Sequence, residues 1–162
     1  MALMNNEGPA DLRLSPAEEA AQHHRRLAAM YAAAPVNAQV PSRVVVEDGR
    51  AEVFATVSPD FWHAAGAMHG ALYFKGLDDA AFFAASSREP TCFVLTARFE
   101  LDFFSPVTTS ELRAVGRCDR ISGRKIEASA ELFVEGLVVA RGRGLFVVSE
   151  RRLLDVDAYR LG

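Results

Sequence analysis

A run of apolar residues from Ala71 to Ala85, in the middle of the chain, limits the folds that the sequence can adopt. The run is too long for a single strand and is rich in Ala, Leu and Phe, so it predicts a buried helix. A helix that is apolar on all sides needs other elements around it. The rest of the chain must therefore supply a layer that covers this helix.

The segments before and after this helix show the pattern of β-strands. Arg43–Glu47 and Arg50–Val57 flank Asp48-Gly49, a dipeptide that favours a tight hairpin turn. After the helix, strands separated by Ser-Pro, Ser-Gly and Glu-Gly turns are expected over Phe93–Phe104, Glu111–Asp119, Lys125–Val134 and Leu137–Val148. This order predicts a single α+β domain in which an antiparallel sheet wraps around one long central helix.

The first 40 residues predict a leader followed by one amphipathic helix. Ser15-Pro16-Ala17-Glu18 combines an N-cap, a proline at the first helical position and a capping-box glutamate. We expect a flexible leader over residues 1–14, a helix that ends near Pro35, and a solvated polar face around His23 and His24. The chain is thus divided into an N-terminal part (1–40), a main domain (41–150) and a polar, peripheral tail (151–162).

The composition excludes several classes of function. The 162 residues suffice for one domain, and a net charge of −3, from 18 Lys and Arg against 21 Asp and Glu, offers no basic field for nucleic acid. No stretch approaches the roughly 20 apolar residues that cross a bilayer, and the N-terminus lacks the features of a signal peptide. The two cysteines, Cys92 and Cys118, form no metal motif and no disulfide framework. We therefore expect a cytoplasmic protein with no nucleic-acid, membrane or metal partner.

Two adjacent carboxylates, Asp78 and Asp79, interrupt the apolar helix. A carboxylate on a buried helix must be paired, open to a cavity, or held in an altered protonation state. Lys75 lies three and four residues earlier and offers one explanation, an ion pair at the one wet edge of the helix. The other explanation is a functional carboxylate in a pocket. The sequence leaves both open.

The residues just before the helix, Met68-His69-Gly70-Ala71, supply a second feature. The first N–H groups of a helix have no partner inside it and carry partial positive charge, so they can bind an oxyanion. His69 is a candidate base or loop-fixing group. An N–H donor and a carboxylate are two parts of an acyl-transfer site. The eight residues from Gly70 to Asp78 span about 12 Å, however, so a second subunit would have to bring the two parts together.

The sequence from His69 to Phe82, HGALYFKGLDDAAF, resembles the HGG…(L/A)D(T/A)A signature of hotdog-fold thioesterases, in particular the PaaI-like group of the phenylacetic acid pathway. The strand end Phe103–Pro106 and the segment Ala140–Gly144 are similar too, and the resemblance covers most of the main domain. It implies a hotdog fold with residues 41–150 as the thioesterase domain. It also implies an acyl-CoA thioesterase that releases a carboxylic acid and free CoA, with no metal and no cofactor beyond the coenzyme A of its substrate.

The resemblance implies a role for each motif residue. Asp78, nine positions after the motif histidine, would be the nucleophile or general base, and Asp79 is the alternative if the motif is shifted by one. Gly70 would supply the oxyanion N–H. Thr96 would orient the attacking water, and His63 stands where many members of the family have Asn or Gln.

The resemblance also implies partners for the site. Members of the family assemble as homodimers, or as homotetramers made of two dimers, with the active site between subunits. The acyl group is expected near Trp62 and Phe82. The phosphates of coenzyme A need cations, and basic residues crowd around one predicted turn. The candidate contacts for coenzyme A are Arg120, Ser122, Gly123, Arg124 and Lys125.

Two other functions are compatible with the sequence. A hotdog hydratase or dehydratase would use a histidine together with the acid, a requirement that His69 meets only in part. A non-catalytic module that binds acyl-CoA or an aromatic ligand would share the fold without catalysis, because a fold does not fix a function. Water addition to an enoyl-CoA would favour the first, and tight binding without turnover would favour the second.

Overall fold

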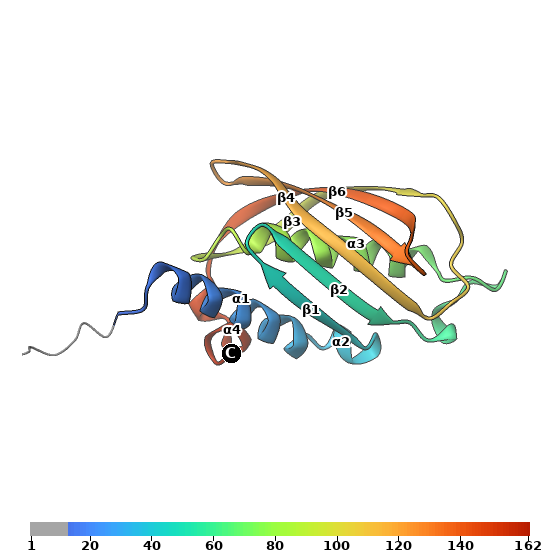
Figure 1. Cartoon of the computed structure of the whole chain (residues 1–162), viewed down its shortest axis with the longest axis horizontal. Helices are drawn as coiled ribbons and strands as arrows, with labels where there is room; N and C mark the ends of the chain where they lie inside the picture. Colours follow the sequence, from blue (N-terminus) through green and yellow to red (C-terminus); the bar gives the residue numbers. More distant parts are fainter. Residues whose placement is uncertain (1–12) are drawn as a thin grey trace, which may run out of the picture.

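The computed structural model describes residues 13–162, so most of the leader predicted for residues 1–14 lies outside the described part (Figure 1). The helices are α1 (Pro16–Ala33), α2 (Val36–Gln39), α3 (Gly70–Ser86) and α4 (Asp157–Arg160). The strands are β1 (Ser42–Glu47), β2 (Arg50–Thr56), β3 (Cys92–Phe103), β4 (Glu111–Ser122), β5 (Lys125–Val134) and β6 (Leu137–Arg152). Two single-turn 3-10 helices, η1 (Pro59–Phe61) and η2 (Leu153–Asp155), lie in the connections. Within residues 13–162, no helix has both the length and the apolar character needed to cross a bilayer.

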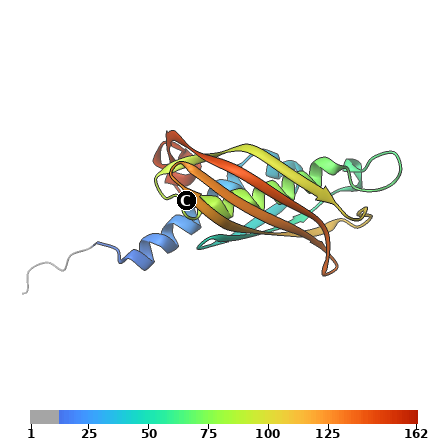
Figure 2. The same ribbon diagram turned by 90° about the horizontal axis from the view of Figure 1, so that it is seen from above.

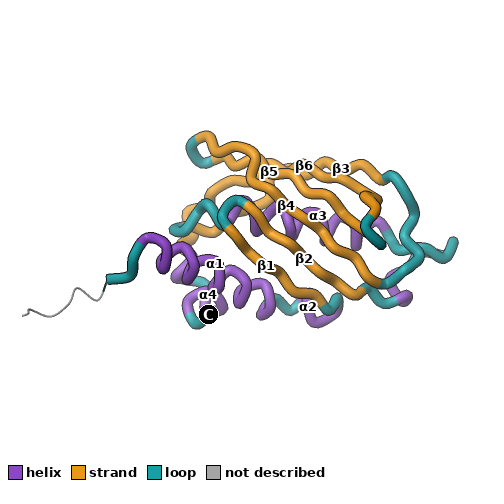
Figure 3. The backbone as a smooth tube through the Cα atoms, viewed as in Figure 1, coloured by secondary structure: helices purple, strands orange, loops and turns teal. Residues whose placement is uncertain are grey.

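The six strands form one antiparallel sheet in the order β1-β2-β4-β5-β6-β3. The sheet curves around α3, which contacts every strand (Figures 1 and 2). Figure 3 shows α1 and the C-terminal α4 together beside β1, at one edge of the sheet. The predicted fold, a sheet wrapped around one long central helix with an extra N-terminal helix, is confirmed.

The predicted strands agree with the structure in position, and β4 and β6 continue well past their predicted ends. The turn between β1 and β2 is Asp48-Gly49, in which Gly49 has a φ of +68° that favours glycine. β4 continues to Ser122 because this residue still pairs with β5 across the hairpin. β6 continues to Arg152, which pairs with Cys92 at the start of β3. An apolar pattern in the sequence marks only the buried part of a strand. Backbone pairing extends the strand beyond that part, into polar residues.

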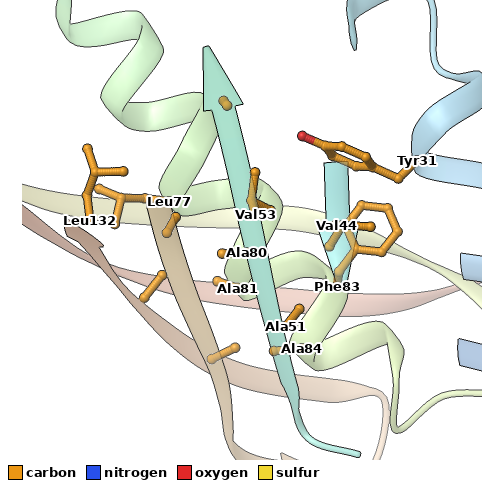
Figure 4. Packing of buried hydrophobic residues seen from close by; sticks show 14 of the residues in the cluster. Tyr31, Val44, Ala51, Val53, Leu77, Ala80, Ala81, Phe83, Ala84 and Leu132 are labelled. Carbon is orange, nitrogen blue, oxygen red and sulfur yellow. The ribbon is translucent and has the colours of Figure 1, made fainter. Parts of the chain in front are cut away.

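Small residues let α3 lie directly against the sheet. Ala80 and Ala84 of α3 and Ala51 of β2 are fully buried in the same core cluster (Figure 4). On the neighbouring β4, Gly116 approaches the helix so closely that a Cβ atom there would stand 2.0 Å from the carbonyl oxygen of Ala80. This contact sets the depth at which α3 packs, and with it the position of Asp78.

The N-terminal helix begins with the predicted capping box. The Ser15 side chain accepts a hydrogen bond from the Glu18 N–H, and the Glu18 carboxylate accepts one of 2.7 Å from the Ser15 N–H. The helix ends at Ala33, just before Pro35, as expected. The short helix α2 that follows has too few residues for a sequence pattern to reveal it.

One expectation about this helix is wrong. His23, expected on a solvated face with His24, is only 6% exposed. Its Nδ1 lies 2.7 Å from the Tyr159 hydroxyl, and its Nε2 lies 2.9 Å from the carbonyl oxygen of Ser86. Because α4 and the end of α3 pack against α1, this histidine faces the interior and joins three helices.

The expectation of a peripheral C-terminal tail is also wrong. Leu153 is 2% exposed and Tyr159 is 4% exposed, so both belong to the core. The partner of Tyr159 is His23, far away in the sequence. The polar local composition of the tail gives no sign of such a long-range contact.

Candidate active site

The ion-pair explanation for the two carboxylates of α3 applies to Asp79. Lys75 Nζ lies 2.5 Å from Asp79 Oδ2 and 2.7 Å from Asn37 Oδ1. The Tyr31 hydroxyl, which comes from α1, lies 3.0 Å from the same Asp79 oxygen. Asp79 is thus held in a polar network with α1 and α2, and Asp78 is left outside this pair.

Asp78 faces the edge strand β3. Its Oδ1 accepts a hydrogen bond of 3.1 Å from the Thr96 hydroxyl. The pairing of β3 with β6 shifts register between Thr96 and Arg98, which places a β-bulge at Ala97. Since a bulge reverses the alternation of a strand, Thr96 and Phe99 both face α3. The bulge therefore sets Thr96 against Asp78 while Phe99 packs against the core.

The surroundings of Asp78 bring its ionisation close to neutral pH. Burial is the main reason that the pKa of Asp78 is raised to about 6. The hydrogen bond from Thr96 opposes this rise in pKa, the negative charge of Asp79 adds to it, and the positive charge of Lys75 opposes it. A carboxylate with this pKa is mostly ionised near pH 7 and can still accept a proton, as a general base must.

The titration of Asp78 is directly measurable. By carboxyl carbon NMR, we expect Asp78 to titrate with a midpoint near pH 6, above the ordinary value of 3.8. Asp79→Asn removes a nearby negative charge that disfavours ionisation, so it should lower the pKa of Asp78. The matched control is Asp155→Asn, which removes an exposed carboxylate on η2 and should leave the midpoint unchanged. A midpoint near 4 in the unmodified protein would contradict the buried setting described here.

An apolar pocket of about 330 Å³ opens beside Asp78 and Thr96. Phe82, Phe83 and Phe93 line it from α3 and β3. A pocket of this size, with an ionisable group on its wall, suits a small apolar ligand. Phe82, one of the two residues predicted to contact an acyl group, thus lines an apolar pocket beside Asp78.

Residues of α1 also line this pocket, a role that the sequence did not indicate. Met30 and Tyr31 of α1, together with Ala34, the C-cap residue that follows the helix, form one side of it. Their helical spacing predicts a buried face, but no local signal tells whether such a face covers a sheet, a second subunit or a pocket. The packing of α1 beside α3 shows that this face lines a pocket.

The start of α3 forms a second feature. His69 is the N-cap of the helix, and its Nδ1 accepts a hydrogen bond of 3.1 Å from the Ala71 N–H. The N–H groups of His69 and Leu72 are bonded to the carbonyl oxygens of Phe61 and His69. In the part of the chain that the structure describes, the Gly70 N–H has no protein acceptor. It is the free donor at the positive end of the helix.

His63 and Gly70 lie on the same hollow, of about 330 Å³, which Tyr73 and Phe103 also line. His63 is exposed, and its Nδ1 accepts a hydrogen bond of 3.2 Å from the Ala65 N–H. The structure thus brings together two of the predicted site residues, His63 and Gly70, at the start of α3.

One chain contains two half-sites. We call the pocket beside Asp78 and Thr96 the carboxylate half-site, and the hollow beside His63 and Gly70 the donor half-site. The two share no lining residue. They are separated by about 12 Å along the axis of α3. Within one chain, a single small reacting group therefore cannot contact both the carboxylate and the donor.

The chain is similar to proteins of known family and structure. The family model "Thioesterase superfamily" matches residues 65–141, which include Gly70, Asp78 and Thr96. The predicted resemblance to hotdog-fold thioesterases is confirmed. The search of curated proteins found no match.

Solved structures share the hotdog fold at low sequence identity. The PaaI protein of Escherichia coli, from the phenylacetic acid degradation operon, aligns with 85% of this chain and 99% of its own, at a TM-score of 0.74 and 20% identity. A putative thioesterase of Ralstonia eutropha, described as related to phenylacetic acid degradation, aligns with 78% of this chain and 99% of its own, at a TM-score of 0.68 and 21% identity. A conserved protein of Pseudomonas aeruginosa aligns with 72% of this chain and 94% of its own, at a TM-score of 0.67 and 25% identity.

Trp62 and Phe82 lie in different places in the hotdog domain. Trp62 follows η1, forms an isolated bridge with Met68 just before α3, and packs against the core. Its indole N–H is buried and has no acceptor within residues 13–162. Phe82 lines the carboxylate half-site instead. The structure therefore does not bring these two aromatic residues to one pocket.

The predicted cation cluster lies on the outer face of the hotdog sheet. Arg120, Ser122 and Lys125 line a hollow of about 550 Å³ there, together with Arg143. β5 alternates buried and exposed residues, and the exposed set, which includes Glu127, faces away from α3. Glu127 also lines the hollow and pairs with Arg120 at 2.8 Å. Within one chain, these cations are on the opposite side of the sheet from α3.

The two remaining candidates of that cluster, Gly123 and Arg124, shape the turn between β4 and β5. Gly123 has a φ of +59°. The Arg124 guanidinium donates two hydrogen bonds, of 3.0 and 2.7 Å, to the carbonyl oxygen of Val148. Three of the five predicted contacts for coenzyme A thus share one hollow, and the other two hold the turn that presents it.

Proposed function

We propose that the protein hydrolyses the thioester of an acyl-CoA to a carboxylic acid and free CoA. The observation that carries this proposal is Asp78, a half-buried carboxylate with a pKa of about 6, bonded to Thr96 at the wall of an apolar pocket. The match to the Thioesterase superfamily and the free Gly70 N–H support it. No metal or cofactor beyond the coenzyme A of the substrate takes part in the proposed reaction, which would run in the cytoplasm.

The proposal assembles the site from two copies of the chain. β3 is an edge strand, and Leu95 and Phe103 on it are 52% and 55% exposed, whereas α1 packs beside the opposite edge strand β1. A long edge strand that exposes apolar side chains is a ready template for pairing. If β3 pairs antiparallel with β3 of a second copy about a twofold axis between Phe99 and Glu100, Thr96 of one copy comes close to Phe103 of the other. The carboxylate half-site then meets the donor half-site of the second copy, in a homodimer or in a homotetramer of two such dimers.

In this arrangement each group has a defined role. The Gly70 N–H donates to the thioester carbonyl oxygen and stabilises the oxyanion that forms on attack. Asp78 either attacks the carbonyl carbon itself or takes the proton of a water that attacks it. Thr96 orients this carboxylate, and His63, on the same hollow as Gly70, helps to position the water. In the general-base route, the C–S bond then breaks and the CoA sulfur takes up the proton that Asp78 accepted, which leaves the carboxylic acid. In the nucleophilic route, cleavage of the C–S bond leaves a mixed anhydride between the acyl group and Asp78. A water then cleaves this anhydride, which releases the carboxylic acid, restores the carboxylate and supplies the proton for the CoA thiolate.

The cations of the outer face are the proposed contacts for the phosphates of coenzyme A. Lys125 and Arg143 line the hollow beside Ser122 and bring positive charge to it. Phosphates bind well to clusters of Lys and Arg. Arg120 shares its charge with Glu127, so it would contribute less than the other two.

The oxyanion role of Gly70 gives a selective test. Gly70→Pro deletes this N–H; proline is tolerated at the first helical position, and the ψ of 140° at His69 suits a residue before proline. With thiol release from a panel of short, long and aryl acyl-CoAs as the assay, we expect Gly70→Pro to lower kcat by about a hundredfold or more. Gly70→Ala is the matched control, because it adds the same Cβ atom, 3.2 Å from the Phe103 ring, and keeps the N–H.

Each outcome of this panel assigns a function. Thiol release that Gly70→Pro removes and Gly70→Ala keeps supports the thioesterase. Water addition to an enoyl-CoA without thiol release would assign a hydratase. Tight binding of acyl-CoA without any turnover would assign a binding module. Equal loss in the proline and alanine variants would show that the N–H is not the reason for the effect.

A further inference from the structure

The carboxylate half-site is walled by a segment outside the matched thioesterase region. Met30 of α1, the C-cap residue Ala34 that follows α1, and Val36 of α2 line the pocket opposite β3. These residues precede residues 65–141, the part of the chain that matches the Thioesterase superfamily. The shape of the pocket therefore depends on how α1 is fixed against α3.

A polar network and an aromatic contact fix this wall. The Tyr31 hydroxyl lies 2.9 Å from Ser42 Oγ and 3.0 Å from Asp79 Oδ2. The Asn37 amide donates to the carbonyl oxygen of Tyr31 at 2.7 Å. The ring of Tyr31 meets that of Phe83 edge to face, with 5.2 Å between centroids. These bonds to α3 and β1 hold the segment from Met30 to Asn37, which we call the wall of the pocket, in one position.

The same network restricts the pocket to ligands that are apolar where they contact the wall. Asn37 and Asp79 line the pocket, and both are occupied by bonds to Tyr31 and Lys75. A substituent that needs a hydrogen bond would have to break this network. The remaining side chains of the wall are apolar, and they include Met30, Ala34 and Val36. Polar chemistry is thus concentrated at Asp78 and Thr96, where the thioester would react.

We propose that α1 and the start of α2 set the acyl specificity of the site, with Ala34 limiting the length of an acyl chain that is hydrocarbon to its end. This inference rests on the proposed function. The pocket of about 330 Å³ is at the lower end of the size range of ligand sites, which restricts the chain to short and medium lengths. A polar group at the far end of the acyl chain would be buried without a partner.

A chain-length series tests the wall. With saturated acyl-CoAs of increasing length, each methylene that the pocket buries should raise kcat/KM by about fourfold until the pocket is full. We expect Ala34→Leu and Ala34→Phe to shift the preferred length downward in that order. For Ala34→Phe, the ratio of kcat/KM for decanoyl-CoA to that for butyryl-CoA should fall by about tenfold or more. An acyl chain with a terminal hydroxyl should react about tenfold more slowly than its unsubstituted counterpart.

The matched control is Ala33→Phe, which adds the same ring one position away, on an exposed residue at the end of α1. It should leave the ratio of kcat/KM values at that of the unmodified protein. An unchanged ratio in Ala34→Leu and Ala34→Phe, or an equal change in Ala33→Phe, would overturn the proposal. Thermal unfolding of each variant separates a misfolded protein from an altered pocket, and Ala34→Leu is the milder of the two substitutions.

A binding measurement separates this inference from the proposed function. Calorimetric titration of decanoate into an Asp78→Asn background needs no turnover and avoids repulsion between two carboxylates. Ala34→Phe should weaken decanoate binding by about tenfold or more, and Ala33→Phe should not weaken it. If no acyl-CoA is hydrolysed but this difference in affinity persists, the thioesterase proposal fails and the specificity wall stands. If hydrolysis occurs and Ala34→Phe changes neither affinity nor chain length, the wall fails alone.

Discussion

Asp78→Asn is expected to lower kcat for acyl-CoA hydrolysis by about a thousandfold, with little change in KM. Asparagine has the shape of aspartate and can still accept the hydrogen bond from Thr96, so the pocket is preserved. It cannot take a proton at neutral pH and is a poor nucleophile. The attack on the thioester carbonyl therefore loses its general base or its nucleophile. Steady-state kinetics with thiol release give both constants directly.

Asp79→Asn is the matched control for this substitution. Asp79 is bound to Lys75 and Tyr31, and its role here is to hold α1 against α3 and to adjust the pKa of Asp78. Its replacement should reduce kcat by less than about tenfold at pH 8, where Asp78 is ionised in either case. A larger loss from Asp79→Asn than from Asp78→Asn would assign the catalytic carboxylate to Asp79.

Mixing the defective chains tests the arrangement of the half-sites. Coexpression of Asp78→Asn and Gly70→Pro chains gives mixed dimers, in which the site between the intact Asp78 and the intact Gly70 is complete. With random pairing, half of the dimers are mixed and one of their two sites works, so about a quarter of the unmodified activity should return. Activity that stays at the level of either variant alone would mean that each site is built within one chain.

The helix that carries Asp78 could be predicted from the sequence because its signals are local. The apolar run from Ala71 to Ala85 allows only a buried helix, and the structure has α3 at Gly70–Ser86. The β1–β2 turn depends on Asp48-Gly49 alone, and the start of α1 depends on four consecutive residues. In such cases the residues that decide the structure are neighbours in the sequence.

The division of labour between Asp78 and Asp79 could not be predicted in this way. Lys75 is close to both in a helix, so spacing leaves the choice open. Tyr31 on α1 and Thr96 on β3 decide it, the first bound to Asp79 and the second to Asp78. Both come from elements far away in the sequence. The bulge at Ala97, which aims Thr96 at Asp78, likewise follows from pairing with β6 rather than from a local pattern.

Buried contacts between the two ends of the chain escaped prediction for the same reason. His23 and Tyr159 stand 136 positions apart, and each lies in a locally polar segment. A histidine in such a segment is usually solvated, and here α4 and the end of α3 bury it against α1. The lining of the carboxylate half-site by Met30 and Ala34 likewise depends on how α1 packs against distant parts of the chain.

Gly116→Ala is expected to destabilise the protein by about 3 kcal/mol or more. The added Cβ atom would lie 2.0 Å from the carbonyl oxygen of Ala80 and 2.7 Å from the amide nitrogen of Ala81. Both are backbone atoms in the middle of α3, so no side chain can turn away to make room. Alanine reduces the conformational freedom of the unfolded chain, which stabilises the folded protein by less than about 1 kcal/mol. The clash is larger and therefore dominates. Urea unfolding at a fixed protein concentration measures the difference in free energy.

Gly76→Ala is the matched control, since Gly76 lies on α3, the helix that Gly116 of β4 contacts, and faces the sheet. A Cβ atom there would lie 3.2 Å from a Leu132 methyl group, the flexible end of a side chain. The gain in helix propensity, about 1 kcal/mol, offsets this crowding, so the net change should be less than about 1 kcal/mol. A change of less than about 1 kcal/mol in Gly116→Ala as well would show that α3 tolerates displacement at Gly116. If Gly116→Ala alone is destabilising and the folded variant also loses activity, the contact between Gly116 and Ala80 holds Asp78 at the depth where Thr96 can reach it.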